Sequence, residues 1–288
     1  AGSTLVQEVA FAIANAITYV QATIDRGLDV DSFAPRLAFN FASFTNLFQE
    51  AAKFRATRRL WARIMRERFG AKNPASWMWR AGAGSGGSTL VAQQPENNIV
   101  RIALHALAGI LGGVQSFHTA AYDEALAIPS EKSALLALRT QQVLAYEGGV
   151  AEVIDPLAGS YYVESLTDQI EAEVNRYLAK IESEGGMIAT IESGWARREI
   201  TKSAWEYQKQ VETGQRLIVG INRFAEEEGE SSIGLHQMDP AVAELQRNRL
   251  IQLRRERDNS RVKRTLSELR KEAQGSGNLM YPIIEAVK

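Results

Sequence analysis

Residues 93–101 read Gln-Gln-Pro-Glu-Asn-Asn-Ile-Val-Arg, and residues 112–125 read Gly-Gly-Val-Gln-Ser-Phe-His-Thr-Ala-Ala-Tyr-Asp-Glu-Ala. The first run predicts an acidic, amide-rich turn into a helix, because apolar residues at helical spacing follow it. The second run begins with a helix-breaking glycine pair and continues as a short strand. We expect the end of this strand to deliver Asp123 and Glu124, and polar groups at the carboxyl end of a barrel strand are typical of a catalytic rim.

Helices and strands alternate on both sides of this stretch. Apolar residues at helical spacing predict four helices, over residues 4–26, 45–69, 97–111 and 131–147. Short apolar runs predict three strands, over residues 35–41, 77–81 and 114–119. Helices and strands that alternate in this way indicate parallel β/α units, and both a barrel and a doubly wound sheet satisfy the pattern.

The character of the sequence changes after Gly148-Gly149. From there, helical spacing predicts four helices, over residues 163–184, 187–193, 196–213 and 240–273. A short strand is expected at 217–219, and a polar, acidic loop at 226–232.

Composition excludes several classes of protein. The net charge of −1 gives no overall field that would draw the chain to nucleic acid or to a membrane. The absence of cysteine excludes disulfides and thiolate metal sites and is compatible with a cytoplasmic location. No apolar run is long enough to predict a membrane span, and the amino terminus lacks a signal-peptide pattern. The opening Ala1-Gly2-Ser3 reads as if the sequence began inside a longer chain.

Residues 247–271 form a basic segment with ten Lys or Arg against three acidic residues. Basic helices contact nucleic acid in some proteins, but here no aromatic residues interleave with the charges. The segment therefore favours a solvated helix face or a contact with a partner subunit.

The run Gly82-Ala83-Gly84-Ser85-Gly86-Gly87 fits the G-x-G-x-x-G pattern after a predicted strand. Such glycines let backbone N–H groups approach a pyrophosphate. However, Pro95 separates the run from the next helix, and no acidic residue follows at the spacing that would bind a ribose. The alternative interpretation is a small-residue loop that lines a cavity.

Five further side chains are candidates for a functional or a structural role. Asp123 and Glu124 are either hydrogen-bond acceptors or acid/base groups, or a solvated pair near a helix start. Arg36 suits bidentate contact with phosphate or carboxylate, or a salt bridge at the rim. His118 is an orienting candidate at the strand end, whereas His105 is expected to be a packed or hydrogen-bonded helix residue. The histidine spacing excludes a His-x-x-x-His metal pair.

Segments along nearly the whole chain resemble one family. They are residues 26–37, 94–101, 111–119, 123–129, 153–164 and 234–240. They resemble the large subunit of the methylmalonyl-CoA mutase family, the coenzyme-B12-dependent acyl-CoA mutases. This resemblance implies an α/β fold, with the last three strands of a (β/α)8 TIM barrel in residues 1–150. Residues 151–288 would be a helical linker toward a cobalamin-binding domain or subunit.

The resemblance also implies an isomerase that rearranges the carbon skeleton of an acyl-CoA by radical chemistry with adenosylcobalamin. By similarity, Glu124 would hold the adenosyl ribose hydroxyls as a catalytic and cofactor-binding residue. Gly87, Ala125 and Ile128 would line the corrin face of the cofactor.

For the substrate, the resemblance implies two groups of residues. Gln115 would belong to the polar wall of the active site, as a catalytic and substrate-binding residue. Arg36, Leu37 and Ala38 would contact the CoA portion. The family's D-x-H-x-x-G signature is absent, so the lower cobalt ligand would come from a small cobalamin-binding subunit or domain, which implies a hetero-oligomer.

Three departures from the family pattern leave the activity open. An H-T-Q-T-like run is replaced by Gly82-Ala83-Gly84-Ser85, an S-F-F run by Ala38-Phe39-Asn40, and an Asn by Ala120. These changes indicate either a different acyl group, branched or hydroxylated, or lost activity in a scaffold subunit. A nucleotide-binding oxidoreductase built around residues 82–87 is the alternative from another class.

Overall fold

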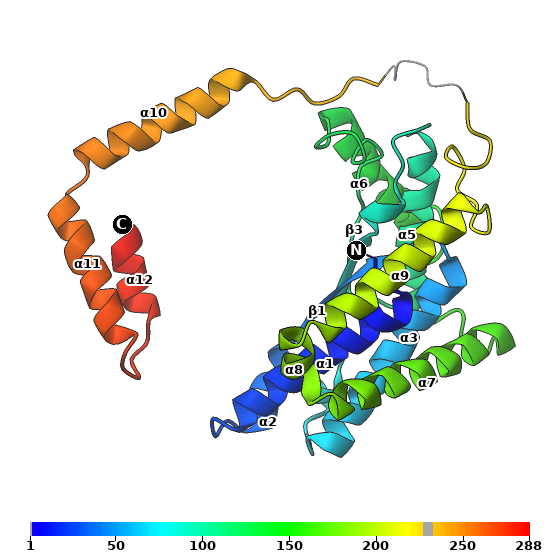
Figure 1. The fold of residues 1–288 in the computed structure, drawn as a ribbon, viewed down its shortest axis with the longest axis horizontal. Helices are drawn as coiled ribbons and strands as arrows, with labels where there is room; N and C mark the ends of the chain where they lie inside the picture. Colours follow the sequence, from blue (N-terminus) through cyan, green and yellow to red (C-terminus); the bar gives the residue numbers. More distant parts are fainter. Residues whose placement is uncertain (1, 227–232) are drawn as a thin grey trace. The chain divides into compact units, whose positions relative to one another are not determined.

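The computed structural model describes residues 2–226 and 233–288, and the chain divides into two compact units, residues 1–236 and 237–288 (Figure 1). The α-helices are α1 Leu5–Ile24, α2 Val30–Phe33, α3 Leu47–Arg63, α4 Pro74–Trp77, α5 Asn97–Gly112, α6 Glu131–Tyr146, α7 Tyr161–Ser183, α8 Gly186–Glu192, α9 Trp195–Glu212, α10 Pro240–Glu256, α11 Asn259–Glu272 and α12 Met280–Val287. A π-helical turn, η2 Ile64–Arg68, extends α3, and η1 Ala34–Arg36 and η3 Gly87–Thr89 are 3-10 turns.

The first unit contains a three-stranded parallel sheet. Its strands are β1 Phe39–Ser43, β2 Ala81–Ser85 and β3 Ser116–His118, in the order β1-β2-β3. α3 connects the first two strands and α5 connects the last two, which confirms the predicted parallel β/α units. Because all three strands run the same way, their carboxyl ends meet at one edge of the sheet.

The two faces of the sheet differ in character because successive side chains of a strand point to opposite sides. Phe41, Ala83 and Phe117 form one row across the strands, on the face that packs into the main core. Phe54 and Trp61 of α3 are fully buried in this core. The opposite face carries Asn40, Ala42, Gly82, Gly84, Ser116 and His118, which are exposed or partly exposed.

A buried charge cluster covers the outer edge of β1 at Ala42. The N–H of Ala42 donates to Glu8 Oε1 at 2.9 Å, and its carbonyl accepts from Lys53 Nζ at 2.6 Å. Lys53 is fully buried and also binds Glu50 Oε2 at 2.6 Å. Charged side chains therefore satisfy backbone groups that an edge strand otherwise leaves unpaired.

Two predicted strands are misplaced. The first begins at Phe39 rather than at residue 35, because Ala34–Arg36 forms a 3-10 turn with Pro35 in its first turn. The predicted strand at 77–81 is wrong in position: Asn73 caps the short helix α4, Pro74 occupies its first position, and β2 follows at Ala81–Ser85. Glycine has a low propensity for strands, so the sequence of β2 does not predict a strand. β2 forms because it pairs with β1 on one side and β3 on the other.

The second half is helical as predicted, with three differences. Residues 217–219 form no strand, and only an isolated bridge joins Val219 to Arg223. The predicted helix at 240–273 is two helices, because Asp258 caps a new one by accepting from the N–H groups of Ser260 and Arg261. α12 was not predicted. Apart from residue 226, the predicted acidic loop at 226–232 lies outside the described residues.

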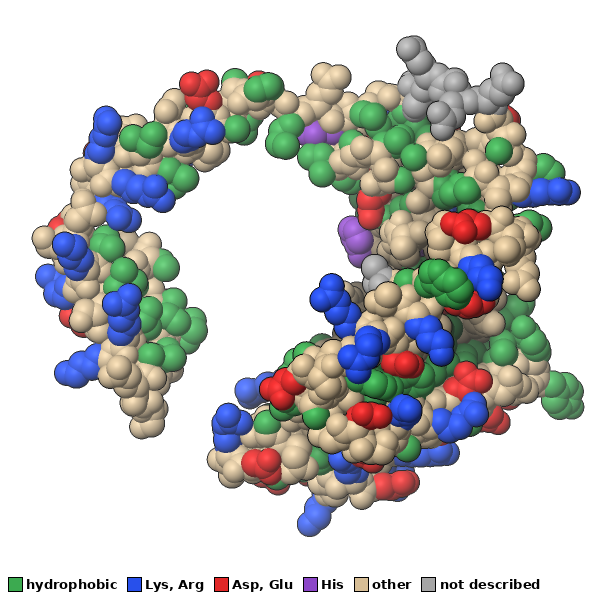
Figure 2. Space-filling model, viewed as in Figure 1, with side chains coloured by type: hydrophobic (Ala, Val, Ile, Leu, Met, Phe, Trp, Pro, Cys, Tyr) green, Lys and Arg blue, Asp and Glu red, His purple; other side chains and the backbone are tan. Residues whose placement is uncertain are grey.

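The second unit consists of α10, α11 and α12. α11 packs against α12, whereas α10 has no buried residue. Lys and Arg side chains line α10 and α11, as the blue atoms in Figure 2 show. Within the described residues, no helix is both long and apolar enough to cross a membrane.

Candidate functional site

The predicted cofactor residues lie beyond the carboxyl edge of the sheet. Gly87 follows β2, and Glu124 lies in the turn after β3, which spans Ser116–His118 within the predicted strand at 114–119. A Cβ atom built on Gly87 would lie 3.0 Å from Glu124 Oε1, so the structure brings these two residues together. Glu124 and Ala125 are exposed, and Ile128 is 59% exposed. The carboxyl edge thus presents the exposed carboxylate of Glu124 and the exposed apolar side chains of Ala125 and Ile128. Gly87 lies next to Glu124 and exposes only its backbone.

Asp123 and Glu124 are not an equivalent pair. Asp123 is fully buried, and its Oδ2 accepts from the N–H of Ser130 at 3.2 Å, just before α6. Its Oδ1 has no hydrogen-bond partner among the described residues. The Asp123 carbonyl accepts from the N–H groups of Leu126 and Ala127. Asp123 therefore shapes the turn, whereas Glu124 is available to a ligand.

The predicted substrate residues lie at the opposite, amino edge of the sheet. Gln115 precedes β3, and its Oε1 accepts from the N–H of Ala81 at 2.6 Å while its Nε2 donates to the Gly113 carbonyl at 3.1 Å. Arg36, in η1, is exposed at the entry to β1. The structure does not bring Gln115 next to Glu124; the sheet separates them.

Leu37 and Ala38 connect η1 to β1, so they lie at the amino edge with Arg36. Leu37 is half-buried against the main core, and Ala38 is exposed. The predicted substrate residues and the predicted cofactor residues therefore occupy opposite edges of one sheet.

The open face of the sheet, between its amino and carboxyl edges, carries mostly polar and small residues. Asn40, Gly82 and Ser116 form one row across the strands. A Cβ atom on Gly82 would lie 2.8 Å from Ser116 Oγ and 3.6 Å from Asn40 Oδ1, so these two side chains close over the glycine. The next row, Ala42, Gly84 and His118, places the exposed imidazole near the carboxyl edge.

The interpretation of residues 82–87 as a dinucleotide-binding loop is wrong. Gly82, Gly84 and Ser85 lie within β2, and the following helix α5 begins only at Asn97. A fingerprint loop must instead lead directly into a helix whose N-terminal N–H groups bind the pyrophosphate. Gly86 is buried where any side chain would overlap the Phe44 ring, so its role is packing.

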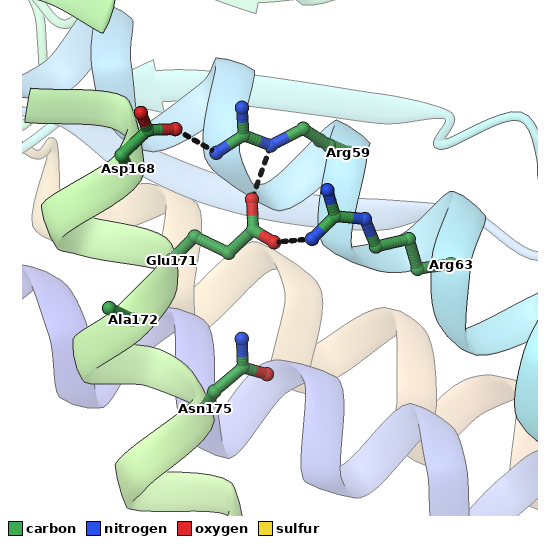
Figure 3. Close-up of a pocket in the computed structure, with 6 residues that line it drawn as sticks. All are labelled: Arg59, Arg63, Asp168, Glu171, Ala172 and Asn175. Carbon is green, nitrogen blue, oxygen red and sulfur yellow. Dashed lines mark hydrogen bonds and ion pairs between the residues drawn. The ribbon is translucent and has the colours of Figure 1, made fainter. Parts of the chain in front are cut away.

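Two surface pockets lie between α3 and α7, away from this sheet edge. The first, of about 260 Å³, is lined by Arg59 and Arg63 of α3 and by Asp168 and Glu171 of α7. Both arginines bind the Glu171 carboxylate, and Arg59 also binds Asp168 at 2.6 Å (Figure 3). Their charges are paired with one another, so the pocket offers no free charge to a ligand.

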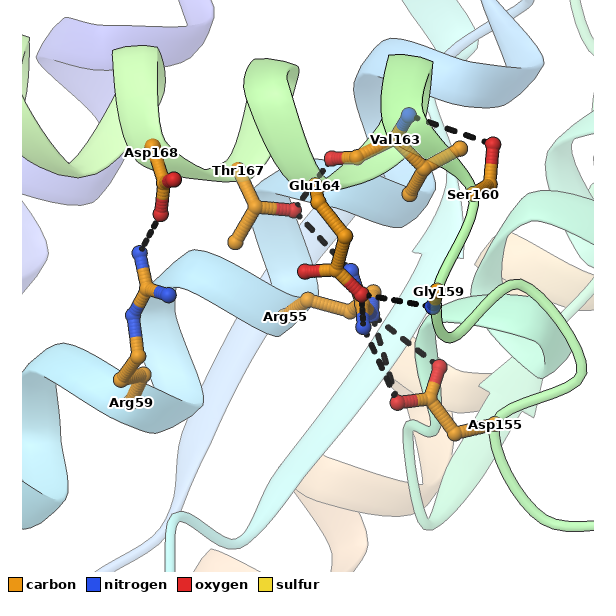
Figure 4. A network of polar contacts seen from close by, with 9 residues as sticks. All are labelled: Arg55, Arg59, Asp155, Gly159, Ser160, Val163, Glu164, Thr167 and Asp168. Carbon is orange, nitrogen blue, oxygen red and sulfur yellow. Dashed lines mark hydrogen bonds and ion pairs between the residues drawn. The ribbon is translucent and has the colours of Figure 1, made fainter.

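The second pocket is lined by a network of polar contacts around Arg55 (Figure 4). Its guanidinium binds Asp155 Oδ1 at 3.0 Å, Glu164 Oε1 at 2.7 Å and Thr167 Oγ1 at 3.2 Å. Hydrogen bonds from Arg55 and from the N–H of Gly159 lower the pKa of Glu164 to about 2. Asp155 has a φ of 49°, so this network holds a strained loop against α3. Sequence reasoning missed it because the partners are far apart in the chain.

The described residues contain no group of three or more His, Cys, Asp or Glu placed to hold a metal ion.

Comparison with known proteins identifies the family of the chain. The sequence pattern of the family described as methylmalonyl-CoA mutase matches residues 1–288. The chain belongs to the methylmalonyl-CoA mutase family. Members of this family are acyl-CoA mutases that use adenosylcobalamin.

Curated relatives match the whole chain. It is 48% identical to the 2-hydroxyisobutanoyl-CoA mutase large subunit of Aquincola tertiaricarbonis and covers 51% of that protein. It is 43% identical to the methylmalonyl-CoA mutase of Rhizobium meliloti (strain 1021) and covers 40% of it. It is 38% identical to the methylmalonyl-CoA mutase of Escherichia coli (strain K12), again over 40% of that protein. The chain thus spans about half the length, or less, of these relatives.

Proposed function

We propose that this chain is part of the catalytic large subunit of an adenosylcobalamin-dependent acyl-CoA mutase. The observation that carries the proposal is the contact of Glu124 with Gly87 at the carboxyl edge of a parallel sheet with a polar open face. The reaction would rearrange the carbon skeleton of methylmalonyl-CoA or of a related branched or hydroxylated acyl-CoA. Family membership supports the reaction class.

The sheet would form the last three strands of an eight-stranded barrel. Three parallel strands cannot close a barrel alone, and a neighbouring strand would have to replace the contacts of Glu8 and Lys53 with Ala42 at the outer edge of β1. Strands outside this sequence would therefore complete it, and the open face with Asn40, Gly82 and Ser116 would face the barrel interior. In this arrangement residues 1–150 belong to the barrel, and residues 151–288 form the helical extension.

The residues at the carboxyl edge fit the cofactor. The Glu124 carboxylate can accept two hydrogen bonds from vicinal hydroxyls, such as those of a ribose. Gly87, Ala125 and Ile128 would let a flat, largely apolar ring system approach the edge without steric conflict. Bound adenosylcobalamin would supply the radical chemistry, and the chain would orient it and exclude competing reactions.

The residues at the amino edge suit the tail of the substrate. Arg36 would bind an anionic group of CoA, with Leu37 and Ala38 beside it. Gln115 already uses its amide to join the amino ends of β2 and β3, so it would act as part of the wall. Substrate and cofactor would then approach along the same face from opposite edges.

The partner would be a small cobalamin-binding subunit or domain that supplies the lower cobalt ligand. One relative is named as the large subunit of a 2-hydroxyisobutanoyl-CoA mutase, and that name implies a second subunit in that enzyme. A hetero-oligomer would follow for the present protein.

A non-catalytic subunit is the second candidate. Gly82 and Gly84 carry no side chain on the open face, and by resemblance they belong to the run that replaces the family's H-T-Q-T-like run. Loss of such groups from a preorganised site commonly costs orders of magnitude in rate.

The test is turnover by the complete protein with its small partner subunit and adenosylcobalamin. Methylmalonyl-CoA, a branched acyl-CoA and 2-hydroxyisobutanoyl-CoA would be supplied separately, and isomeric products separated by mass spectrometry. Cofactor-dependent isomerisation of one of them is expected. Partner binding without turnover of any acyl-CoA would favour the scaffold.

A further inference from the structure

A buried histidine joins the loops that follow β1 and β2. His105 of α5 is fully buried, and its Nε2 lies 3.2 Å from Thr45 Oγ1 and 3.3 Å from Thr89 Oγ1. Thr45 follows β1, and Thr89 lies in η3 after β2. The His105 carbonyl also accepts from Ser43 Oγ at 2.9 Å. One residue of α5 thus contacts both loops at the carboxyl edge.

The donors and acceptors around His105 determine which ring nitrogen carries the proton. The Thr89 hydroxyl donates its one proton to the Gly86 carbonyl at 2.8 Å, so toward the imidazole it can only accept. Nδ1 is buried and has no partner among the described residues. Leaving the Nδ1 lone pair without a hydrogen bond costs less free energy than leaving a buried N–H group without an acceptor, and such unpaired N–H groups are rare in proteins. The proton therefore lies on Nε2.

The imidazole is also neutral. Burial, and then the positive charge of Arg101, lower the pKa of His105 to about 4. A protonated ring would add a buried, unpaired N–H at Nδ1, so the geometry disfavours the charged form for the same reason.

The loop held by His105 is the one that carries Gly87. The N–H of Gly86 donates to the Ser43 carbonyl at 2.7 Å, and the Gly86 carbonyl accepts from the N–H and the hydroxyl of Thr89. Gly87 follows directly and meets Glu124. A chain of contacts therefore runs from His105 through Thr89 and Gly86 to the Gly87–Glu124 contact.

We propose that His105 is a positioning residue of the cofactor site: as a neutral Nε2–H donor it fixes the Gly86–Thr89 loop, and so the place of Gly87 against Glu124. This rests on the proposed function, because the group positioned is the one that would receive the cofactor. His105 acts through the loop and touches no ligand. Its loss is expected to weaken cofactor binding while acyl-CoA binding is retained.

The first test needs no cofactor. Long-range ¹⁵N–¹H correlation spectra of the complete protein, with the His105 signals assigned by their absence in His105→Gln, report the tautomer directly. A neutral Nε2–H ring at pH 7 is expected. An Nδ1–H tautomer or a charged imidazolium would overturn the proposal whether or not the protein is a mutase.

The second test separates positioning from packing. His105→Gln can keep an N–H donor near the Nε2 position, whereas His105→Leu removes it. The apparent Kd for adenosylcobalamin is expected to rise about tenfold in His105→Leu, the equivalent of one lost hydrogen bond, and less than threefold in His105→Gln. The KM for acyl-CoA is expected to stay within about twofold in both. Equal losses in the two variants, or no loss in a folded His105→Leu, would overturn the proposal.

Thr89 provides an independent pair if His105→Leu fails to fold. Thr89→Val removes the hydroxyl at nearly constant shape, and Thr89→Ser retains it. Only Thr89→Val is expected to weaken adenosylcobalamin binding, by about tenfold, and equal effects would overturn the proposal. A wild-type protein that binds no adenosylcobalamin would instead refute the proposed function, and the tautomer measurement would still decide the state of His105.

Discussion

The carboxylate of Glu124 lies against the backbone of Gly87, so closely that a Cβ atom at position 87 would be 3.0 Å from Oε1. The two residues belong to loops after different strands of the sheet. Their contact places an exposed carboxylate at the carboxyl edge of the sheet, where parallel α/β folds bind their ligands.

Replacing Glu124 by Gln keeps the shape of the side chain and removes its charge. Hydrogen bonds to a charged acceptor are about twice as strong as neutral ones, so we expect adenosylcobalamin affinity to fall roughly tenfold to a hundredfold. Titration of the complete enzyme with the cofactor measures this change. Glu147→Gln, at an exposed position after α6, is the matched control and should bind as the wild type does. Unchanged affinity in Glu124→Gln would contradict the assignment.

Gly87→Ala tests the contact from the other side. The backbone at Gly87 is not left-handed, so alanine adds no backbone strain, and the Glu124 carboxylate must move by a few tenths of an ångström. We expect a severalfold loss of cofactor affinity, with the free energy of unfolding changed by less than about 1 kcal/mol. Loss of folding, with no effect on binding in the folded fraction, would show that the contact is only structural.

The Arg55 network makes a prediction about stability. Arg55→Ala leaves Asp155 and Glu164 without their shared partner, and the free energy of unfolding should fall by about 2 kcal/mol, below the fully buried case because both carboxylates are partly exposed. Chemical denaturation measures the loss. Arg176→Ala is the control: this exposed arginine pairs with Glu173 at 3.5 Å, and its loss should cost less than about 0.5 kcal/mol. Equal effects would contradict the network's role.

Lys53 makes a stronger prediction because it is fully buried. Lys53→Met would leave Glu50 buried without its cation, and burial already raises the pKa of Glu50. We expect a loss of about 3–5 kcal/mol in the free energy of unfolding. The double variant Lys53→Met/Glu50→Gln should recover part of it, because the buried charge of Glu50 is gone, whereas Glu8, which is 21% exposed, still lacks its contact with Lys53. Additive losses in the double variant would contradict the account.

Two pKa shifts predict how stability depends on pH. His105 has a lowered pKa, so between about pH 6.5 and 4 the unfolded chain binds a proton that the folded chain does not. Stability should therefore fall as the pH falls through this window, by up to about 3 kcal/mol. Glu164, whose pKa is also lowered, should add a further loss between about pH 4.5 and 2. In His105→Gln the first loss should disappear while the second remains, as denaturation at several pH values would show.

The sequence predicted the order of helices and strands well, for physical reasons that differ by element. Long amphipathic helices such as α1 and α7 carry apolar residues at a spacing that strands cannot use. β2 was misplaced because Ala-Gly-Ala-Gly-Ser has no local preference for a strand. Only the neighbours β1 and β3, which pair with it on both sides, make it one.

The site was less accessible to sequence reasoning than the fold. The strand pattern pointed to Glu124, and only the family resemblance assigned Glu124 and Gly87 to a cofactor. Nothing local in the sequence indicates that these two residues lie close together. His105 was expected to be a packed or hydrogen-bonded helix residue, which the structure confirms. Its link to Thr45 and Thr89 depends on loops that are distant in the chain, and a single histidine gives no spacing signal.

The most direct measurement of the central claim is electron paramagnetic resonance of the complete protein, mixed with its small partner subunit and adenosylcobalamin and frozen after addition of an acyl-CoA. We predict a radical signal that appears only with a productive acyl-CoA and is strongly reduced in Glu124→Gln. A complete protein that binds both cofactor and acyl-CoA but never gives a substrate-dependent radical signal would contradict it.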